Sequence, residues 1–191
     1  MKKVMVVGAG ALGSHVVQFL RSVDCAMTVI DFDRVERKNT LSQFHARAAV
    51  GKSKVQSLQQ SLRFLFGREL GVVPHRLTAD NVEVLLTGAD LVLDCLDNAE
   101  GRRLVQRQVR AGAIPCLHGA LAADGSFGRV VWDEEFQIDA EPHHGAPTCE
   151  NGEHLPFIAV TAGYLALAAR RFVVDGDKIG FNLHPAGAIS F

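Results

Sequence analysis

The sequence predicts an α/β protein with a doubly wound, mostly parallel β-sheet whose C-terminal strands are antiparallel. Short apolar runs that end in glycine or aspartate alternate with segments of helical period, as expected for parallel strands buried on both faces. A glycine-rich turn, Gly8-Ala-Gly10-Ala-Leu-Gly13, joins the first apolar run to the first helical segment. Alternation of this kind places helices on both faces of the sheet.

Each element follows from its own local pattern. Buried parallel strands are expected at residues 4–7, 27–30, 91–93 and 114–117. A weaker strand at 72–77 contains Pro74, which cannot donate to a ladder and therefore indicates an edge of the sheet. Helices are expected after the glycine turn, from residue 55 to Gly67, from a cap at Asp80 through Leu86, at 99–111 and at 155–169. Later strands, expected to be antiparallel, are 126–132, 178–183 and 188–191. Together these elements predict a Rossmann-like sheet.

Length and composition restrict the classes of function. The chain of 191 residues suits one domain spanning residues 1–191. Twenty Lys and Arg against 21 Asp and Glu leave a net charge of -1 without a basic stripe, so we expect no nucleic acid partner. The apolar run 155–169 is shorter than the roughly 20 residues of a membrane-spanning helix, so we expect a buried helix and no membrane. No secretion signal and no Cys-x-x-Cys pair appear, which favours a cytoplasmic protein with reduced thiols.

The glycine turn predicts a nucleotide site. Gly8, Gly10 and Gly13 allow a tight turn, and the free N–H groups of the following helix point at anionic oxygen. Asp31 ends the second strand, where a carboxylate can bind ribose hydroxyls. These residues alone indicate an adenine nucleotide, with NAD as the usual ligand.

The residues that follow favour a triphosphate over hydride transfer. Because parallel strands end along one edge of a sheet, Asp31, Asp97 and the glycine turn are expected to share one crevice, with Asn39 and Lys54 beside it. Lys54 then suits phosphate oxygens, and Asp97 suits Mg²⁺. Taken singly, Lys54 would favour a solvated helix start and Asp97 a helix N-cap, but the residues taken together do not favour these roles.

The ordered set of motifs resembles the ThiF/MoeB/HesA superfamily, the bacterial relatives of ubiquitin-activating enzymes. The resemblance covers nearly the whole chain. It rests on Gly8–Gly13, Asp31-x-Asp33-x-Val35, Asn39, Gln43, Gly51-x-x-Lys54, Leu93-Asp-Cys-x-Asp97-Asn98 with Arg102, Pro115 followed by Gly119-Ala120, and Thr148-Cys149 followed by Pro156 and an Ala-rich helix.

This resemblance implies ATP- and Mg²⁺-dependent adenylation of the C-terminal glycine carboxylate of a small ubiquitin-like or sulfur-carrier protein. The residues that it implies for nucleotide binding are Gly8, Gly10, Gly13, Asp31, Asp33, Asn39, Gln43, Lys54, Asp97 and Asn98. Asn39 and Lys54 would steady the phosphates in catalysis, and Asp97 would hold the metal. The sequence leaves open which carrier and pathway are served.

Three features depart from the family pattern. Ser42 stands where an arginine commonly precedes the glutamine, and the family's helix before the first strand, which lends an arginine to the partner subunit, has no counterpart before residue 4. The paired Cys-x-x-Cys motif is missing, so we expect no structural zinc. Compensating cations are expected from Arg34, Arg37 or Arg47, or from a second protein.

Cys149 lies in a polar, aperiodic segment, residues 133–153, and matches a sulfur-handling cysteine of some thiamine-pathway members. It is interpreted either as an acyl or sulfur acceptor or as an inert cysteine. A metal clasp of His143, His144, Cys149 and His154 fits no standard spacing. The remaining cysteines, which lie on or beside apolar strands and are expected to pack in the core, are Cys25, Cys95 and Cys116.

Two other functions stay open at this point. One is a non-catalytic or half-site subunit of a heteromeric enzyme, favoured by Ser42. The other is an NAD-dependent oxidoreductase, supported only by the glycine turn and Asp31. A homodimer or heterodimer is expected in any case, because the helix at 155–169 is apolar around most of its circumference and one sheet covers only one side of it.

Overall fold

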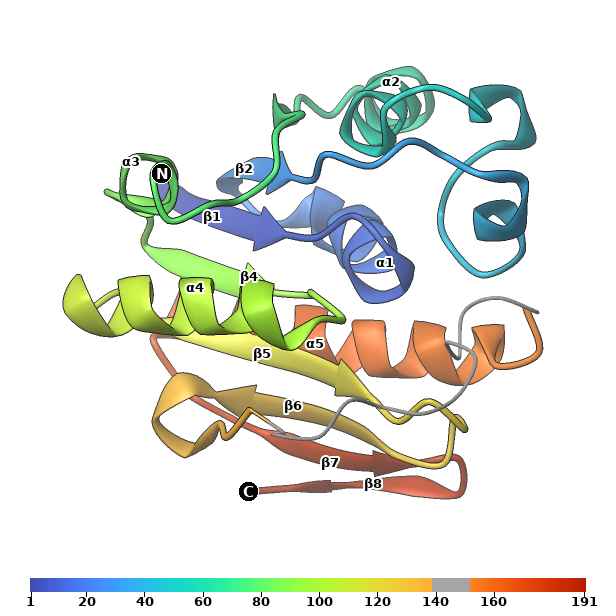
Figure 1. The fold of residues 1–191 in the computed structure, drawn as a ribbon. Helices are drawn as coiled ribbons and strands as arrows, with labels where there is room; N and C mark the ends of the chain where they lie inside the picture. Colours follow the sequence, from blue (N-terminus) through green and yellow to red (C-terminus); the bar gives the residue numbers. More distant parts are fainter. Residues whose placement is uncertain (139–151) are drawn as a thin grey trace.

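The computed structural model describes residues 1–138 and 152–191 of the chain. They form one eight-stranded sheet in the order β3-β2-β1-β4-β5-β6-β7-β8 (Figure 1). The parallel strands are β3 (Gly71–Val73), β2 (Cys25–Ile30), β1 (Lys2–Val7), β4 (Leu91–Asp94) and β5 (Cys116–Leu121). The antiparallel strands that continue the sheet are β6 (Gly128–Trp132), β7 (Phe181–His184) and β8 (Gly187–Ser190). The predicted fold class is confirmed.

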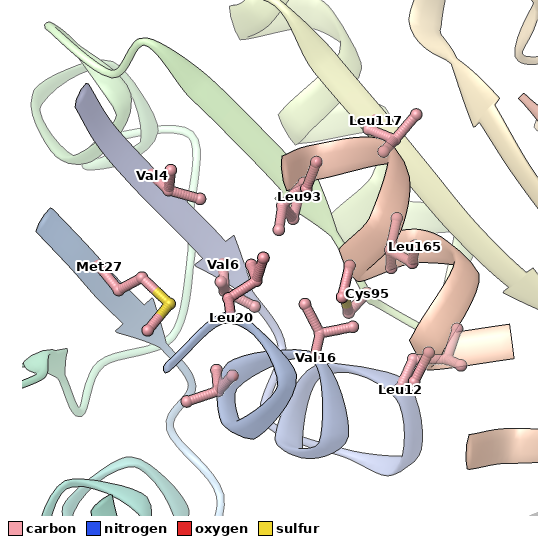
Figure 2. Close-up of a cluster of buried hydrophobic side chains, with 14 of the residues drawn as sticks. Val4, Val6, Leu12, Val16, Leu20, Met27, Leu93, Cys95, Leu117 and Leu165 are labelled. Atoms are coloured by element: carbon pink, nitrogen blue, oxygen red, sulfur yellow. The ribbon is translucent and has the colours of Figure 1, made fainter. Parts of the chain in front are cut away.

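Helices cover both faces of this sheet. One face packs against α1 (Ala11–Phe19), α2 (Lys54–Phe66) and α5 (Leu155–Asp175), and the other against α3 (Val82–Leu86) and α4 (Ala99–Ala111). Alternate residues of each central strand enter opposite layers, because successive side chains of a strand point to opposite faces. Figure 2 shows the larger layer, in which strand and helix side chains meet: Val4, Val6, Met27, Leu93 and Leu117 from strands, and Leu12, Val16 and Leu165 from helices.

Most element boundaries agree with the local patterns to within two residues, and several differ by more. Helix α2 ends at Gly67, which adopts a left-handed conformation with φ of 63°, as a helix-terminating glycine does. Strand β3 is shorter than expected, because it stops before Pro74. The N-cap of α3 is Asn81, so the cap predicted at Asp80 was wrong. Strand β5 begins two residues later than predicted, and strand β7 begins three residues later.

Helix α5 runs six residues beyond the predicted end. Arg170 and Arg171 are exposed, and charged side chains that face solvent do not end a helix; the left-handed Gly176 does. By length and composition alone α5 could cross a membrane, but its apolar face packs against α1, β5 and β6. Val160 and Leu167 lie on the uncovered side, with exposed fractions of 46% and 43%.

Candidate nucleotide site

The turn between β1 and α1 is closed by contacts that only glycine permits. Gly8 has a φ of 97°, and a β-carbon there would lie 3.0 Å from the carbonyl oxygen of Cys95. A β-carbon on Gly13 would lie 1.9 Å from the carbonyl oxygen of Gly8. By contrast, no described atom lies within 4 Å of the β-carbon position of Gly10. The turn is therefore packed tightly against the protein at both ends and open in the middle, where an anionic group can approach the backbone.

Two side chains hold Ala9 at the centre of this turn. Asp31 accepts a hydrogen bond from the Ala9 N–H at 2.6 Å, and it also accepts one from the Asp33 N–H at 2.7 Å. Nε2 of His45 lies 2.9 Å from the Ala9 carbonyl oxygen. Burial raises the pKa of Asp31, although these backbone N–H groups and Lys54 oppose the shift. Burial lowers the pKa of His45 to about 4, so its imidazole is neutral at pH 7 and donates through Nε2.

The segment that carries Gln43 is packed against the start of α1. The Phe44 N–H donates to Ser14 Oγ at 2.9 Å, and Nε2 of His15 lies 3.0 Å from the Ser42 carbonyl oxygen. Ser42 itself is fully buried, so the position where the family resemblance implies an arginine is an interior one. Oε1 of Gln43 is buried without a hydrogen-bond partner among the described residues. An unpaired buried amide oxygen is costly, so this group favours a ligand that donates to it.

Lys54 opens α2 and is buried, with an exposed fraction of 7%. Its ammonium lies 2.9 Å from Asp33 Oδ2, and its backbone N–H donates to the Asp33 carbonyl. A solvated lysine at this position is therefore excluded. Asn39 is also buried, and its Oδ1 accepts a hydrogen bond from the Glu36 N–H in a capping box. Both predicted phosphate-binding residues are thus held in place by their own neighbours.

Asp97 is exposed in the short connection between β4 and α4. The N-cap of α4 is the next residue, Asn98, whose side chain accepts a hydrogen bond from the Gly101 N–H at 2.8 Å. The alternative role of Asp97 as a helix cap is therefore wrong, and no hydrogen bond or ion pair engages its carboxylate among residues 1–138 and 152–191. Leu96 lies against the glycine turn, since its side chain comes within 3.4 Å of the β-carbon position of Gly8.

These residues share the carboxyl edge of the parallel strands, as predicted. The turn after β1, the carboxylates after β2 and Asp97 after β4 follow three neighbouring strands. Their chemistry fits a nucleoside triphosphate: backbone donors and Lys54 for phosphate oxygens, and the accepting groups Asp31 and Gln43 for hydroxyl or amino donors. Mg²⁺ is commonly bound by one or two carboxylates together with phosphates, which a single exposed Asp97 satisfies. In the described part of the chain, no three His, Cys, Asp or Glu side chains form a metal cluster.

The proposed compensating arginines lie on the exposed loop between β2 and α2. Arg34 donates to the Gly51 carbonyl at 2.8 Å, and Arg37 and Arg47 are exposed. Cys149, His143 and His144 lie outside the described residues, so the structure does not place them. Cys25, Cys95 and Cys116 are buried free thiols, and the prediction that they pack in the core is confirmed.

Sequence reasoning missed a buried polar cluster next to this edge. Asp94 and His118 are fully buried at the same level of β4 and β5, and Nδ1 of His118 lies 2.7 Å from Asp94 Oδ2. Arg102, which the motif comparison singled out, also reaches Asp94, at 3.3 Å. The available signal was a polar residue at an inward position of an otherwise apolar strand.

The sequence profile of the ThiF family matches residues 1–186. The chain belongs to the ThiF family. The molybdopterin-synthase adenylyltransferase of Escherichia coli is 34% identical over 191 residues, which cover 92% of this chain and 74% of the relative. The SAMP-activating enzyme E1 of Haloferax volcanii is 37% identical over 189 residues, which cover 91% of this chain and 67% of the relative.

Solved structures agree with this assignment of the fold. Escherichia coli MccB superposes with a TM-score of 0.80 at 15% identity, over 100% of this chain and 62% of the MccB chain. The chain thus spans less than two thirds of MccB and between two thirds and three quarters of the two ThiF-family relatives.

Proposed function

We propose that this chain is an ATP-dependent adenylyltransferase that activates the C-terminal carboxylate of a small sulfur-carrier or ubiquitin-like protein. The observation that carries the proposal is the preformed turn at Ala9, held by Asp31 and His45 beside a buried lysine and an exposed aspartate. The relatives named adenylyltransferase and activating enzyme support this class of reaction.

In the proposed reaction, a carboxylate oxygen of the carrier attacks the α-phosphorus of ATP. A new oxygen–phosphorus bond forms, the bond from the α-phosphorus to the oxygen that bridges to the β-phosphate breaks, and pyrophosphate leaves with that electron pair. The protein contributes position and charge: backbone N–H groups of the turn and the Lys54 ammonium face phosphate oxygens that gain charge. Asp97 would hold Mg²⁺, which neutralises charge on the phosphates when bound.

Pyrophosphate exchange tests the proposal directly. With its carrier, the protein should exchange labelled pyrophosphate into ATP only when Mg²⁺ is present. Asp97→Ala should lower this exchange by roughly a hundredfold, the scale observed when one charge-stabilising group is removed. Glu100→Ala is the matched control, because Glu100 is an exposed carboxylate in the first turn of the same helix, α4. Normal exchange in Asp97→Ala would contradict the metal assignment.

Two other functions predict different binding. An NAD-dependent oxidoreductase would bind NAD in preference to ATP, which equilibrium titration of both ligands decides. A half-site subunit is favoured by the buried Ser42, which leaves no guanidinium at that position. Such a subunit would bind ATP and a partner chain but would catalyse no exchange alone.

We further propose that Cys149 acts after adenylation. Either its thiolate attacks the acyl-adenylate and AMP leaves, which forms a thioester, or it takes a sulfane sulfur from a persulfide donor, which leaves as a thiol. In the sequence, Cys149 lies between the proposed site residues and helix α5, which supports this role. A thiol at this position could react with the acyl-adenylate in a second step. Cys149→Ser should keep pyrophosphate exchange and abolish any thiol-sensitive link to the carrier. A parent protein that forms no such link under non-reducing conditions would favour an inert cysteine.

A further inference from the structure

A fully buried histidine connects three separate elements beneath α4. Nδ1 of His118 on β5 lies 2.7 Å from Oδ2 of Asp94, the last residue of β4. Its Nε2 lies 3.1 Å from Oδ1 of Asp133, in the turn after β6. Phe136 stacks on the imidazole, with ring centroids 3.9 Å apart. The two hydrogen bonds fix where the ring nitrogens point, and the stacking fixes the plane of the ring.

Helix α4 supplies the cations of this cluster. Arg102 donates to Asp94 Oδ2 at 3.3 Å and to the Gly119 carbonyl at 2.8 Å. About two turns further along the helix, Arg110 donates to Asp133 Oδ2 at 2.7 Å. Burial alone would raise the pKa of Asp94, but Arg102 and the His118 hydrogen bond outweigh burial and hold that pKa below its usual value. Asp94 is therefore an anion at neutral pH, with both oxygens available as acceptors.

The second oxygen of Asp94 leads to the catalytic edge. Oδ1 accepts a hydrogen bond from the Leu96 N–H at 3.0 Å, and the next residue is Asp97. On its other side, Asp97 is followed by Asn98, which is fixed as the cap of α4. The backbone that carries Asp97 is thus tied at both ends, and the first of these ties depends on the orientation of the Asp94 carboxylate.

We propose that His118 is a positioning residue for Asp97, which it controls by fixing the Asp94 carboxylate that holds the Leu96 backbone. The assignment rests on the proposed function for the role of Asp97 as the metal-binding carboxylate. His118 contacts neither the nucleotide edge nor Asp97, so its effect passes through Asp94. Residues that orient a metal-binding group typically change metal affinity by 10- to 100-fold when they are replaced.

Two substitutions separate the contacts of His118. The amide of asparagine can place its nitrogen near the position of Nδ1 and keep the bond to Asp94, whereas leucine keeps volume and removes both contacts. We expect His118→Leu to raise the Mn²⁺ concentration for half-saturation roughly tenfold, measured by electron paramagnetic resonance with a non-hydrolysable ATP analogue. His118→Asn should restore most of that affinity. Leu183→Ala, a buried change in β7 away from the cluster, is the control for general destabilisation.

Amide hydrogen exchange in the ligand-free protein provides a readout that needs neither metal nor catalysis. The Leu96 N–H should exchange at least several-fold faster in His118→Leu, but not in Leu183→Ala at matched stability. Unchanged Leu96 exchange, or equal Mn²⁺ affinity in parent and His118→Leu, would overturn the positioning role. A parent protein that binds Mn²⁺ and ATP but never exchanges pyrophosphate would instead contradict the proposed function alone.

Discussion

Nε2 of His45 lies 2.9 Å from the carbonyl oxygen of Ala9, which is 36 residues earlier in the chain. The same residue, Ala9, donates its N–H to Asp31. The turn that we propose as the nucleotide site is therefore held by one carboxylate on its donor side and by one neutral histidine on its acceptor side.

Replacing His45 should weaken ATP binding without removing any proposed ligand contact. In His45→Phe the buried Ala9 carbonyl loses its partner, at a cost of about 1–2 kcal/mol, and the turn loses part of its order. We expect ATP affinity to fall roughly tenfold in isothermal titration without carrier. His184→Phe is the control, because His184 is an exposed histidine on β7, away from the turn. Equal affinity in His45→Phe and the parent would show that the turn holds its shape unaided.

Stability should fall as the pH drops from 7 to 5. Burial lowers the pKa of His45 to about 4, so the unfolded chain binds a proton near pH 6.5 that the folded protein does not bind. Protonation therefore favours the unfolded state over the window from about pH 6.5 to about pH 4. The expected loss from His45 between pH 7 and pH 5 is about 2 kcal/mol. His15, whose pKa burial also lowers, adds in the same direction.

Urea unfolding at pH 7 and pH 5 measures the loss in the free energy of unfolding, and the same measurement on His45→Phe shows how much of that loss is due to His45. The substitution should reduce the difference in the free energy of unfolding between pH 7 and pH 5. If parent and variant show the same pH dependence, the proton is taken up elsewhere. The pKa values of Asp94 and Asp133 are lowered by their cationic partners, so their contribution is lost only in more acidic solution, below about pH 4.

Lys54 should matter far more for catalysis than for stability. Its buried ammonium contacts a carboxylate, Asp33, that is itself 46% exposed, so the desolvation cost offsets much of the attraction. We expect Lys54→Met to lower pyrophosphate exchange roughly a hundredfold and to shift the unfolding temperature by only a few degrees. Lys52→Met, on the exposed neighbouring residue, should leave both unchanged. A large loss of stability in Lys54→Met with residual exchange intact would assign Lys54 a structural role.

The uncovered side of α5 should form an interface between two chains. Val160, Leu167 and Val174 are exposed by 46%, 43% and 58% and lie seven residues apart, so they form one apolar stripe. Leu167→Glu should convert a dimer into a monomer in sedimentation experiments at micromolar concentration. Val84→Glu serves as the control, because it makes the same kind of change at an exposed apolar residue of α3, on the opposite face of the sheet. A parent chain that is monomeric at both micromolar and nanomolar concentration would refute the interface. In that case, replacing Arg34, Arg37 and Arg47 one at a time would identify the cation that compensates for the missing family arginine.

The sequence predicted the parallel half of the fold well because its signals are local. The bounds of α4 follow from residues 99–111 alone, and the glycine turn could be placed from its position between a strand and a helix. The end of α5 could not, since a surface charge such as Arg170 is compatible with either a continuing or an ending helix. The cap of α3 was assigned to Asp80, although the neighbouring Asn81 occupies that position.

The candidate site was predicted in composition but not in its internal contacts. Strand order places Asp31, Lys54 and Asp97 near one edge, and that inference needs only topology. His45 and His118 act through partners that are 36 and 24 residues away in the sequence. The sequence pattern around a single histidine does not indicate which distant residue it contacts. Such long-range polar contacts become visible only when the chain is folded.

A side chain at position 13 would collide with the Gly8 carbonyl oxygen, because the first helix touches the turn at that point. The turn that we propose as the phosphate site is therefore held in shape by contacts within the described residues, without a bound nucleotide. Pre-organisation of this kind removes most of the ordering cost of association. We expect the rate of ATP binding to be set by diffusion and by the charge of the triphosphate. The rate-limiting steps of the catalytic cycle should then be those that involve the protein substrate.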